Sequence, residues 1–450
     1  MQIDLTKGNI AKSIILFSFP MIVGNLLQQL YNIADTLIVG KFIGTDALAA
    51  VGSAYTLMVF ITSIILGLCM GSGAVFSIRY GEKNEKKLKE SVFISFILIA
   101  FISLILNVFA FVFIDNIMAF LNVPPEIYPL MRNYIFIIFF GIIATFLYNY
   151  YASLLRAIGN SFIPLVFLGV SALLNIFLDL YFIISLGMGV QGAAIATVFS
   201  QFVSGIGISI YTLTKFDEFR FSKEYMRWNK GILKEIFKFS FLTCMQQSIM
   251  NFGILMVQGL VNSFGAVIMA AFAAAVKIDS FAYMPVQDFG NAFSTFIAQN
   301  YGAKNKERIK KGIKVAIGLT FVFCLVISLI VFIFAKQLMS IFINVNELEI
   351  INAGVLYLRV EGSFYIGIGL LFLLYGIYRA VEKPFMSVVL TVISLGTRVL
   401  LAYVLSAVPQ IGVVGIWVSV PIGWILADAV GVMYYLFNKK RIEYKFTEIM

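Results

Sequence analysis

The chain alternates long apolar stretches with short polar segments, and the stretches are long enough to cross a bilayer as α helices. Each is bounded by charged residues, proline or glycine. Twelve can be counted, at residues 11–38, 47–78, 91–114, 128–153, 161–184, 190–214, 234–262, 266–300, 312–335, 350–378, 384–406 and 412–437. The ten-residue alternating segments of a membrane β barrel do not occur in the sequence. The pattern predicts an all-α membrane protein with twelve transmembrane helices.

Composition agrees with this interpretation. The chain is 61% hydrophobic and 12% charged, whereas soluble domains average about 25% charged residues. The first apolar stretch starts near Ala11 and is not followed by a small-residue cleavage site, so we expect no removable signal peptide.

Several short motifs occur twice in the chain. Residues 156–158 and 189–192 reappear at 379–381 and 412–415, about 223 positions later, and residues 80–84 reappear at 301–305 with an offset of about 221. A repeat of this length is too long for a solenoid and indicates two homologous six-helix lobes. Six is an even number, so we expect both lobes to cross the bilayer in the same sense, about a pseudo-two-fold axis along the membrane normal. The predicted domains are residues 1–214, a linker 215–233, and residues 234–450.

The segment Lys215–Lys238 is the longest charged stretch and marks the boundary between the lobes. Its aromatic residues, which include Phe219, Tyr225 and Trp228, are compatible with a helix lying in the membrane interface. A solvated connector is the alternative.

Basic residues are concentrated on one side of the predicted membrane. With an inside N-terminus, 27 of the 33 lysines and arginines fall in inside segments. These segments are 1–12, 79–90, 153–160, 215–238, 301–314, 379–383 and 439–445. The bias predicts a multi-pass protein of the bacterial inner (cytoplasmic) membrane with both termini cytoplasmic. The net charge of +10 is divided among short loops, so we expect no nucleic-acid partner.

Missing residue types exclude several kinds of chemistry. The chain has no histidine, and Cys69, Cys244 and Cys324 are scattered through apolar spans without metal-ligand spacing. No phosphate-cradling loop and no catalytic triad is present. We therefore expect no enzyme activity and no cofactor. A catalytic pair of aspartates is the alternative to this expectation.

Polar residues inside the spans carry the functional hypothesis, since a charge at bilayer depth costs about 2.5–3.5 kcal/mol. Asp35 shares a helix face with Tyr31 and Gln28, Asn175 shares one with Asp179, and Thr197 shares one with Gln201. Oxygen ligands of this kind suit a hard cation such as Na⁺, or the two acids can share a proton. The alternatives are acids that only hydrogen-bond between packed helices, and an aspartyl-protease site.

Pro20 lies in the first span, where a proline frees a carbonyl group and favours a kink. We expect a hinge there or a static bend. In the second lobe, Asn175 aligns with Arg398 and Asp179 with Ala402, so the second copy has lost those acids. Candidates for a substrate cleft between the lobes are Gln28, Gln246, Asn251, Asp279, Gln287, Asp288 and Glu361. Asp279 could instead pair with Lys277, and Arg398 could neutralise Glu361.

Several of these residues together resemble the multidrug and toxic-compound extrusion (MATE) transporters. The resemblance rests on Phe19-Pro20-Met21, on residues 28–36 and 48–52, on 156–160 with Asn175 and Asp179, and on 187–197, and it continues in the second lobe with Arg379-Ala380, Pro384, Arg398 and 412–417. It covers essentially the whole chain. Segments 261–265 and 277–283 look most like the MepA-type bacterial branch.

The resemblance implies two six-helix bundles around a central cleft and the export of cationic, amphipathic drug-like compounds in exchange for H⁺ or Na⁺. It also implies that Asp35, Asn175, Asp179, Thr197 and Tyr31 form the proton or cation site, that Na⁺ is the one metal ion this site could take, and that Pro20 is the hinge. Another branch places acids in the seventh and tenth helices. Here the seventh span has only amides and Glu361 has no obvious second acid.

We expect cationic drugs and the lipid bilayer as partners, and a monomeric protein. Two other functions stay open: a flippase for lipid-linked oligosaccharides or cell-wall precursors, which needs a basic cleft, and a membrane enzyme acting on lipid.

Overall fold

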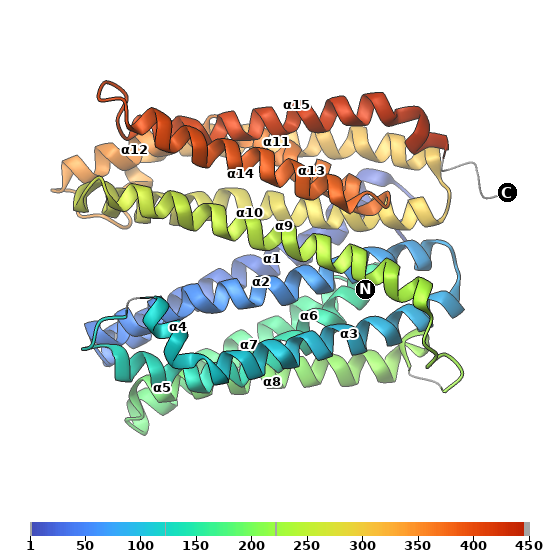
Figure 1. Cartoon of the computed structure of the whole chain (residues 1–450), viewed down its shortest axis with the longest axis horizontal. Helices are drawn as coiled ribbons and strands as arrows, with labels where there is room; N and C mark the ends of the chain where they lie inside the picture. The colour runs from blue at the N-terminus through green and yellow to red at the C-terminus, as the bar shows by residue number, and fades with distance from the viewer. Residues whose placement is uncertain (1, 122, 221–222, 445–450) are drawn as a thin grey trace. The chain divides into compact units, whose positions relative to one another are not determined.

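A computed structural model describes residues 2–121, 123–220 and 223–444, and all regular structure in these ranges is helical (Figure 1). The helices of the first repeat are α1 Ile10–Phe42, α2 Thr45–Gly81, α3 Glu85–Val112, α4 Ile114–Phe120, α5 Tyr128–Phe139, α6 Gly141–Ala157, α7 Phe162–Leu180, the π-helical turn η1 Tyr181–Ser185 and α8 Gly189–Lys215. After the 3-10 turn η2 Asp217–Phe219 come α9 Lys230–Asn262, α10 Ala266–Gly302, α11 Lys306–Met339, α12 Leu348–Gly362, α13 Tyr365–Ala380, α14 Pro384–Ser406 and α15 Val414–Tyr444.

Each of the twelve apolar stretches corresponds to one helix or to a bent pair. Within the described ranges, 9 helices are long and apolar enough to cross a membrane, and counting each bent pair as one span raises the number to 11. The pairs are α5 with α6, bent by 43°, and α12 with α13, bent by 49°. The remaining stretch is α9, which is long enough but carries the polar residues Gln246, Gln247 and Asn251 in mid-helix. The predicted all-α membrane fold is confirmed.

The internal repeat is visible in the backbone as well as in the sequence. Lys83 and Lys304, 221 positions apart, both adopt left-handed conformations, with φ of 55° and 56°. In each case the next residue is an asparagine whose side chain accepts a hydrogen bond from the backbone three residues on, at 3.0 Å for Asn84 and 3.1 Å for Asn305. This is the usual N-cap of a helix, and it starts α3 and α11 in the same way.

The chain divides into two compact units. The first comprises Met1–Asp4 and Phe19–Cys244, and the second comprises Leu5–Ser18 and Met245–Met450. The first helix of each repeat is therefore shared, because α1 begins in the second unit and α9 begins in the first. In the second unit, Arg308 of α11 donates hydrogen bonds to the carbonyls of Leu5, Lys7 and Gly8. The domain limits taken from the sequence stay a prediction.

The segment between α8 and α9 contains no α helix in its described residues, 216–220 and 223–229. The hypothesis of an interfacial helix is therefore wrong for these residues. Phe219 is only 1% exposed, and η2 lies against α3. The segment is rich in charged residues and has no continuous apolar face that a helix could bury. It therefore forms turns, which the buried Phe219 ring holds in place.

Each unit has its own apolar core with aromatic side chains at its centre. In the first unit, Phe96 lies 5.5 Å from Phe146 and 5.3 Å from Tyr150, measured between ring centroids. In the second unit, Phe272 stacks on Trp417 at 5.4 Å, and Tyr357 meets the same indole edge-on at 5.0 Å. Such pairs add about 0.5–1.5 kcal/mol each beyond the area they bury.

Two glycines four residues apart let α2 and the first half of α9 pack backbone to backbone. A Cβ atom on Gly67 would lie 2.5 Å from Cα of Cys244, and one on Gly71 would lie 2.5 Å from Cα of Ser240. This small-xxx-small spacing is the common device for close helix contact in membranes. The Ser240 hydroxyl bonds both the carbonyl of Leu68, at 3.0 Å, and the hydroxyl of Ser72, at 2.8 Å.

We expect Gly71→Ala to lower the thermal stability of the purified protein by about 1–3 kcal/mol, since the added methyl meets backbone that has no room to move. Gly52→Ala on the same helix is the control, because a Cβ there has nothing within 4 Å. Thermal unfolding in detergent measures both variants. Equal melting temperatures for the two would show that this contact is looser than the structure indicates.

Candidate functional site

Asp35 near the end of α1 and Asp179 near the end of α7 approach each other within hydrogen-bonding range. Asp179 is 0% exposed. Among the described residues, both of its carboxylate oxygens and Oδ1 of Asp35 are buried without a hydrogen-bond donor. Two ionised carboxylates can only accept hydrogen bonds, and they repel each other. If the two acids hold one proton between them, the protonated carboxyl group donates a hydrogen bond to the ionised one, and the repulsion is removed.

Asn175 and Thr197 extend this site by one helical turn. Asn175 is 2% exposed and lies four residues before Asp179 on the same face of α7. Its Nδ2 donates to Oγ1 of Thr197 on α8 at 3.3 Å, which leaves the Asn175 carbonyl oxygen buried and without a donor. The two hydrogen-bonded side chains thus offer oxygen atoms beside the paired acids.

Tyr31 lies one turn before Asp35, within electrostatic range of it, and close to Gln28. The structure therefore brings together the side chains that the sequence placed in the proton or cation site, and all of them lie in the first unit. The spacing of four residues on α1 and α7 was the signal that identified them.

Sequence reasoning missed Tyr134 of α5. This side chain is 6% exposed and lies within electrostatic range of Asp35, Asp179 and Tyr31. A tyrosine in an apolar, aromatic-rich stretch cannot be told from a packing residue by sequence pattern. The fold is needed to place α5 beside the acids.

The hinge at Pro20 stays a prediction. α1 continues through Pro20 from Ile10 to Phe42, although the division between the two units falls close by, between Ser18 and Phe19.

The second unit contains an acidic cluster of its own. The Tyr365 hydroxyl of α13 donates to Oδ1 of Asp279 on α10 at 2.6 Å. Glu361 of α12 lies close to Tyr357, one helical turn before it. Asp279, Glu361 and Arg398 of α14 lie within electrostatic range of one another. We call these five residues the C-unit cluster.

The C-unit cluster corrects the expectation that Glu361 has no second acid. Asp279 supplies it from the eighth span, and the two acids are 6% and 3% exposed. The rival pairing of Asp279 with Lys277 is wrong, because Lys277 is exposed and Asp279 accepts its bond from Tyr365. Half-buried Asp428 on α15 was also missed; it lies within electrostatic range of Tyr375.

The other candidates for the substrate cleft lie in differing surroundings. Gln28 is exposed on α1, whereas Gln246 on α9 is 2% exposed. Asn251, Gln287 and Asp288 are half-buried. A cleft shared by these residues stays a prediction.

In the part of the chain that the structure describes, no group of three or more Cys, Asp or Glu side chains could hold a metal ion. A cation at the first-unit site would therefore depend on amide and hydroxyl oxygens in addition to the two acids.

Comparison with known proteins identifies the family. The family model named MatE matches residues 20–181 and 241–404, which together make up most of the chain. The protein belongs to the MATE family. As a MATE protein it is a multi-pass membrane transporter.

Two curated relatives show how far the similarity to other MATE proteins extends. This chain is 29% identical over 448 residues to the probable multidrug resistance protein YpnP of Bacillus subtilis, covering 99% of both chains. It is 28% identical over 375 residues to the multidrug export protein MepA of Staphylococcus saprophyticus, covering 81% of both. A MOP superfamily transporter from Pyrococcus furiosus has the same fold, with a TM-score of 0.91, 24% identity and coverage of 98% of both chains.

Proposed function

We propose that this protein is a secondary active multidrug efflux antiporter of the bacterial cytoplasmic membrane, with both termini cytoplasmic, that exports cationic amphipathic compounds in exchange for protons. Family membership and the names of the relatives support the class of function. The one observation that carries the coupling mechanism is the approach of Asp35 to Asp179 without a buried cationic partner among the neighbours described above.

The geometry favours a proton over Na⁺ as the coupling ion. A pair of buried acids at hydrogen-bonding range is stable when it holds one proton, and it repels when it holds none. Na⁺ would need several oxygen ligands directed at one point, and one of the two neutral side chains at the site, Thr197, already uses a lone pair to accept a hydrogen bond from Asn175.

Proton exchange is sufficient to drive the export of a monovalent cation. Swapping one proton for one such cation moves no net charge, so the membrane potential contributes nothing. The pH gradient then supplies about 1.4 kcal/mol per pH unit, enough for roughly a tenfold drug gradient. A second proton would add about 2.3 kcal/mol per 100 mV of potential.

Purified protein in liposomes tests this proposal. We expect ethidium transport to follow an imposed pH gradient in the absence of Na⁺, and to collapse when a protonophore is added. Transport that responds to a Na⁺ gradient but not to a pH gradient would show that Na⁺ is the coupling ion. The absence of drug transport under either gradient would overturn the antiporter function itself.

A further inference from the structure

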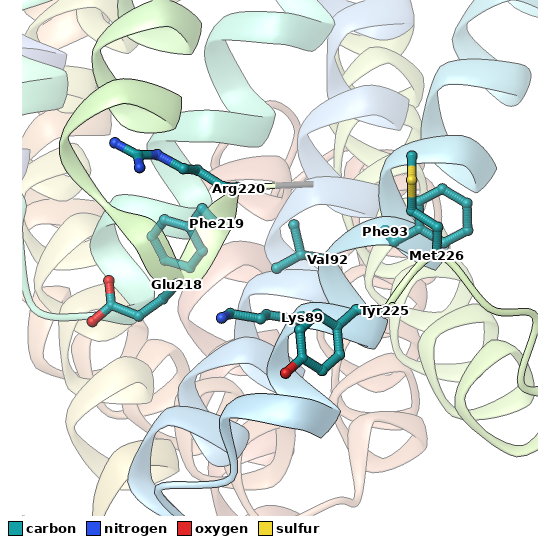
Figure 2. A pocket seen from close by; sticks show the side chains of 8 residues that line it. All are labelled: Lys89, Val92, Phe93, Glu218, Phe219, Arg220, Tyr225 and Met226. Carbon is teal, nitrogen blue, oxygen red and sulfur yellow. The ribbon is translucent and has the colours of Figure 1, made fainter. Parts of the chain in front are cut away.

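A shallow, open pocket lies in the first unit, between the start of α3 and the segment that follows α8 (Figure 2). Eight residues line it: Lys89, Val92, Phe93, Glu218, Phe219, Arg220, Tyr225 and Met226. The pocket is separate from the acid pair, and neither the transport mechanism nor the family comparison uses it.

The base of the pocket is held in place by fixed contacts. Val92 and Phe219 are each 1% exposed. The Arg220 guanidinium donates to the carbonyls of Leu213, at 3.0 Å, and Thr214, at 2.7 Å. These carbonyls belong to the last turn of α8, where a cation is favourable. Arg220 thus ties the pocket wall to the end of a transmembrane helix.

Lys89 supplies a positive charge with no ion pair among the described residues. Its ammonium lies 5.1 Å from the centre of the Tyr225 ring, a cation–π contact that positions the charge without neutralising it. Glu218 is the one acid that lines the pocket, against Lys89 and Arg220. Arg220 is ion-paired with Asp217, Nη1 to Oδ1 at 2.6 Å, so Lys89 is the lining cation that has no ion pair among the described residues.

We propose that this pocket binds the headgroup phosphate of an anionic glycerophospholipid. A lysine without an ion pair lies beside tyrosine, phenylalanine and methionine at the end of apolar helices. Its ammonium can bind a headgroup phosphate, and the apolar side chains can contact the acyl chains. The adjoining segments 79–90 and 215–238 are rich in lysine and arginine, which attracts an anionic lipid surface. The assignment to the inner leaflet rests on the proposed cytoplasmic orientation, and the pocket itself does not depend on the transport function.

Native mass spectrometry of the full chain with added phosphatidylglycerol tests the site. One lysine near an anionic lipid surface contributes about 1 kcal/mol, so we expect Lys89→Gln to weaken binding of one phosphatidylglycerol about fivefold. Lys89→Arg keeps the charge and should bind like the parent chain. Lys223→Gln is the matched control, because this lysine lies on the same segment without lining the pocket. Phosphatidylcholine should bind equally to all four proteins.

Two results would overturn the proposal. One is equal retention of phosphatidylglycerol by Lys89→Gln and Lys223→Gln. The other is displacement of the bound lipid by excess inorganic phosphate, which would identify a site for free phosphate. If Lys89→Gln does not fold, Tyr225→Ala removes the contact that positions Lys89, and it must show the same selective loss. Because the readout is lipid binding, the result is independent of drug transport.

Discussion

Asp179→Asn is expected to abolish proton-driven drug efflux while leaving the amount of folded protein unchanged. Asparagine matches aspartate in size but cannot carry a proton on and off. The acid pair would then lose its exchange step, although its packing in α7 would be kept. Asp35→Asn should have the same effect, because one remaining acid no longer has a partner with which to share the proton. Ethidium efflux from cells and from liposomes under an imposed pH gradient measures both variants.

Asp46→Asn is a suitable control for these variants. Asp46 is an exposed acid in the first turn of α2, so we expect efflux within about twofold of the parent chain, since an exposed charge near a helix start is worth about 0.3–1 kcal/mol. Normal drug efflux by both Asp35→Asn and Asp179→Asn would contradict coupling at the first-unit site. Loss of efflux in Asp46→Asn as well would point to a general effect of charge.

The first-unit site was predictable from sequence because its signals are local. Asp179 lies four residues after Asn175, so one helix face had to carry both, and an acid at bilayer depth is rare enough to stand out. The Asn175–Thr197 hydrogen bond then joins α7 to α8, which are separated in the chain only by the short turn η1 and a few residues. Tyr134 has no such signal, because its type is common in apolar spans.

The C-unit cluster was only partly predictable because its contacts are long-range. Asp279 and Tyr365 are 86 residues apart, while Lys277, two residues from Asp279, offered a nearer partner. Neighbours in sequence point to different sides of a helix, and helix packing decided between these partners. Sequence patterns limit which faces are polar, but they do not say which helices meet.

The second repeat therefore did not simply lose its acids. At the positions that align with Asn175 and Asp179 it carries Arg398 and a fully buried Ala402. Its acids lie instead on α10 and α12, and Arg398 lies within electrostatic range of both. The first unit compensates its acid pair with a mobile ion, in the function proposed above, whereas the C-unit cluster contains a permanent cation. The two repeats thus have similar helices but compensate their buried acids in different ways.

Removing both acids of the C-unit cluster is expected to destabilise the protein, and removing Arg398 as well should restore it. Asp279→Asn with Glu361→Gln leaves the half-buried Arg398 guanidinium without an opposing charge. Breaking a buried charge pair from one side costs about 3–5 kcal/mol, and we expect about 2 kcal/mol here because Arg398 keeps part of its surface exposed. Adding Arg398→Gln removes the uncompensated charge, so the triple variant should unfold near the temperature of the parent chain. Thermal unfolding in detergent at low salt measures the series.

The triple variant separates charge compensation from packing. A cluster held by its hydrogen bonds alone, such as Tyr365 to Asp279, would be damaged further by a third substitution. Recovery of stability on removing Arg398 is expected only if the guanidinium charge was the cause of the loss. A double variant as stable as the parent chain, or a triple variant less stable than the double, would show that Arg398 is neutralised elsewhere. With recovery, the arginine is the counter-ion that lets α10 and α12 bury two acids in the same unit.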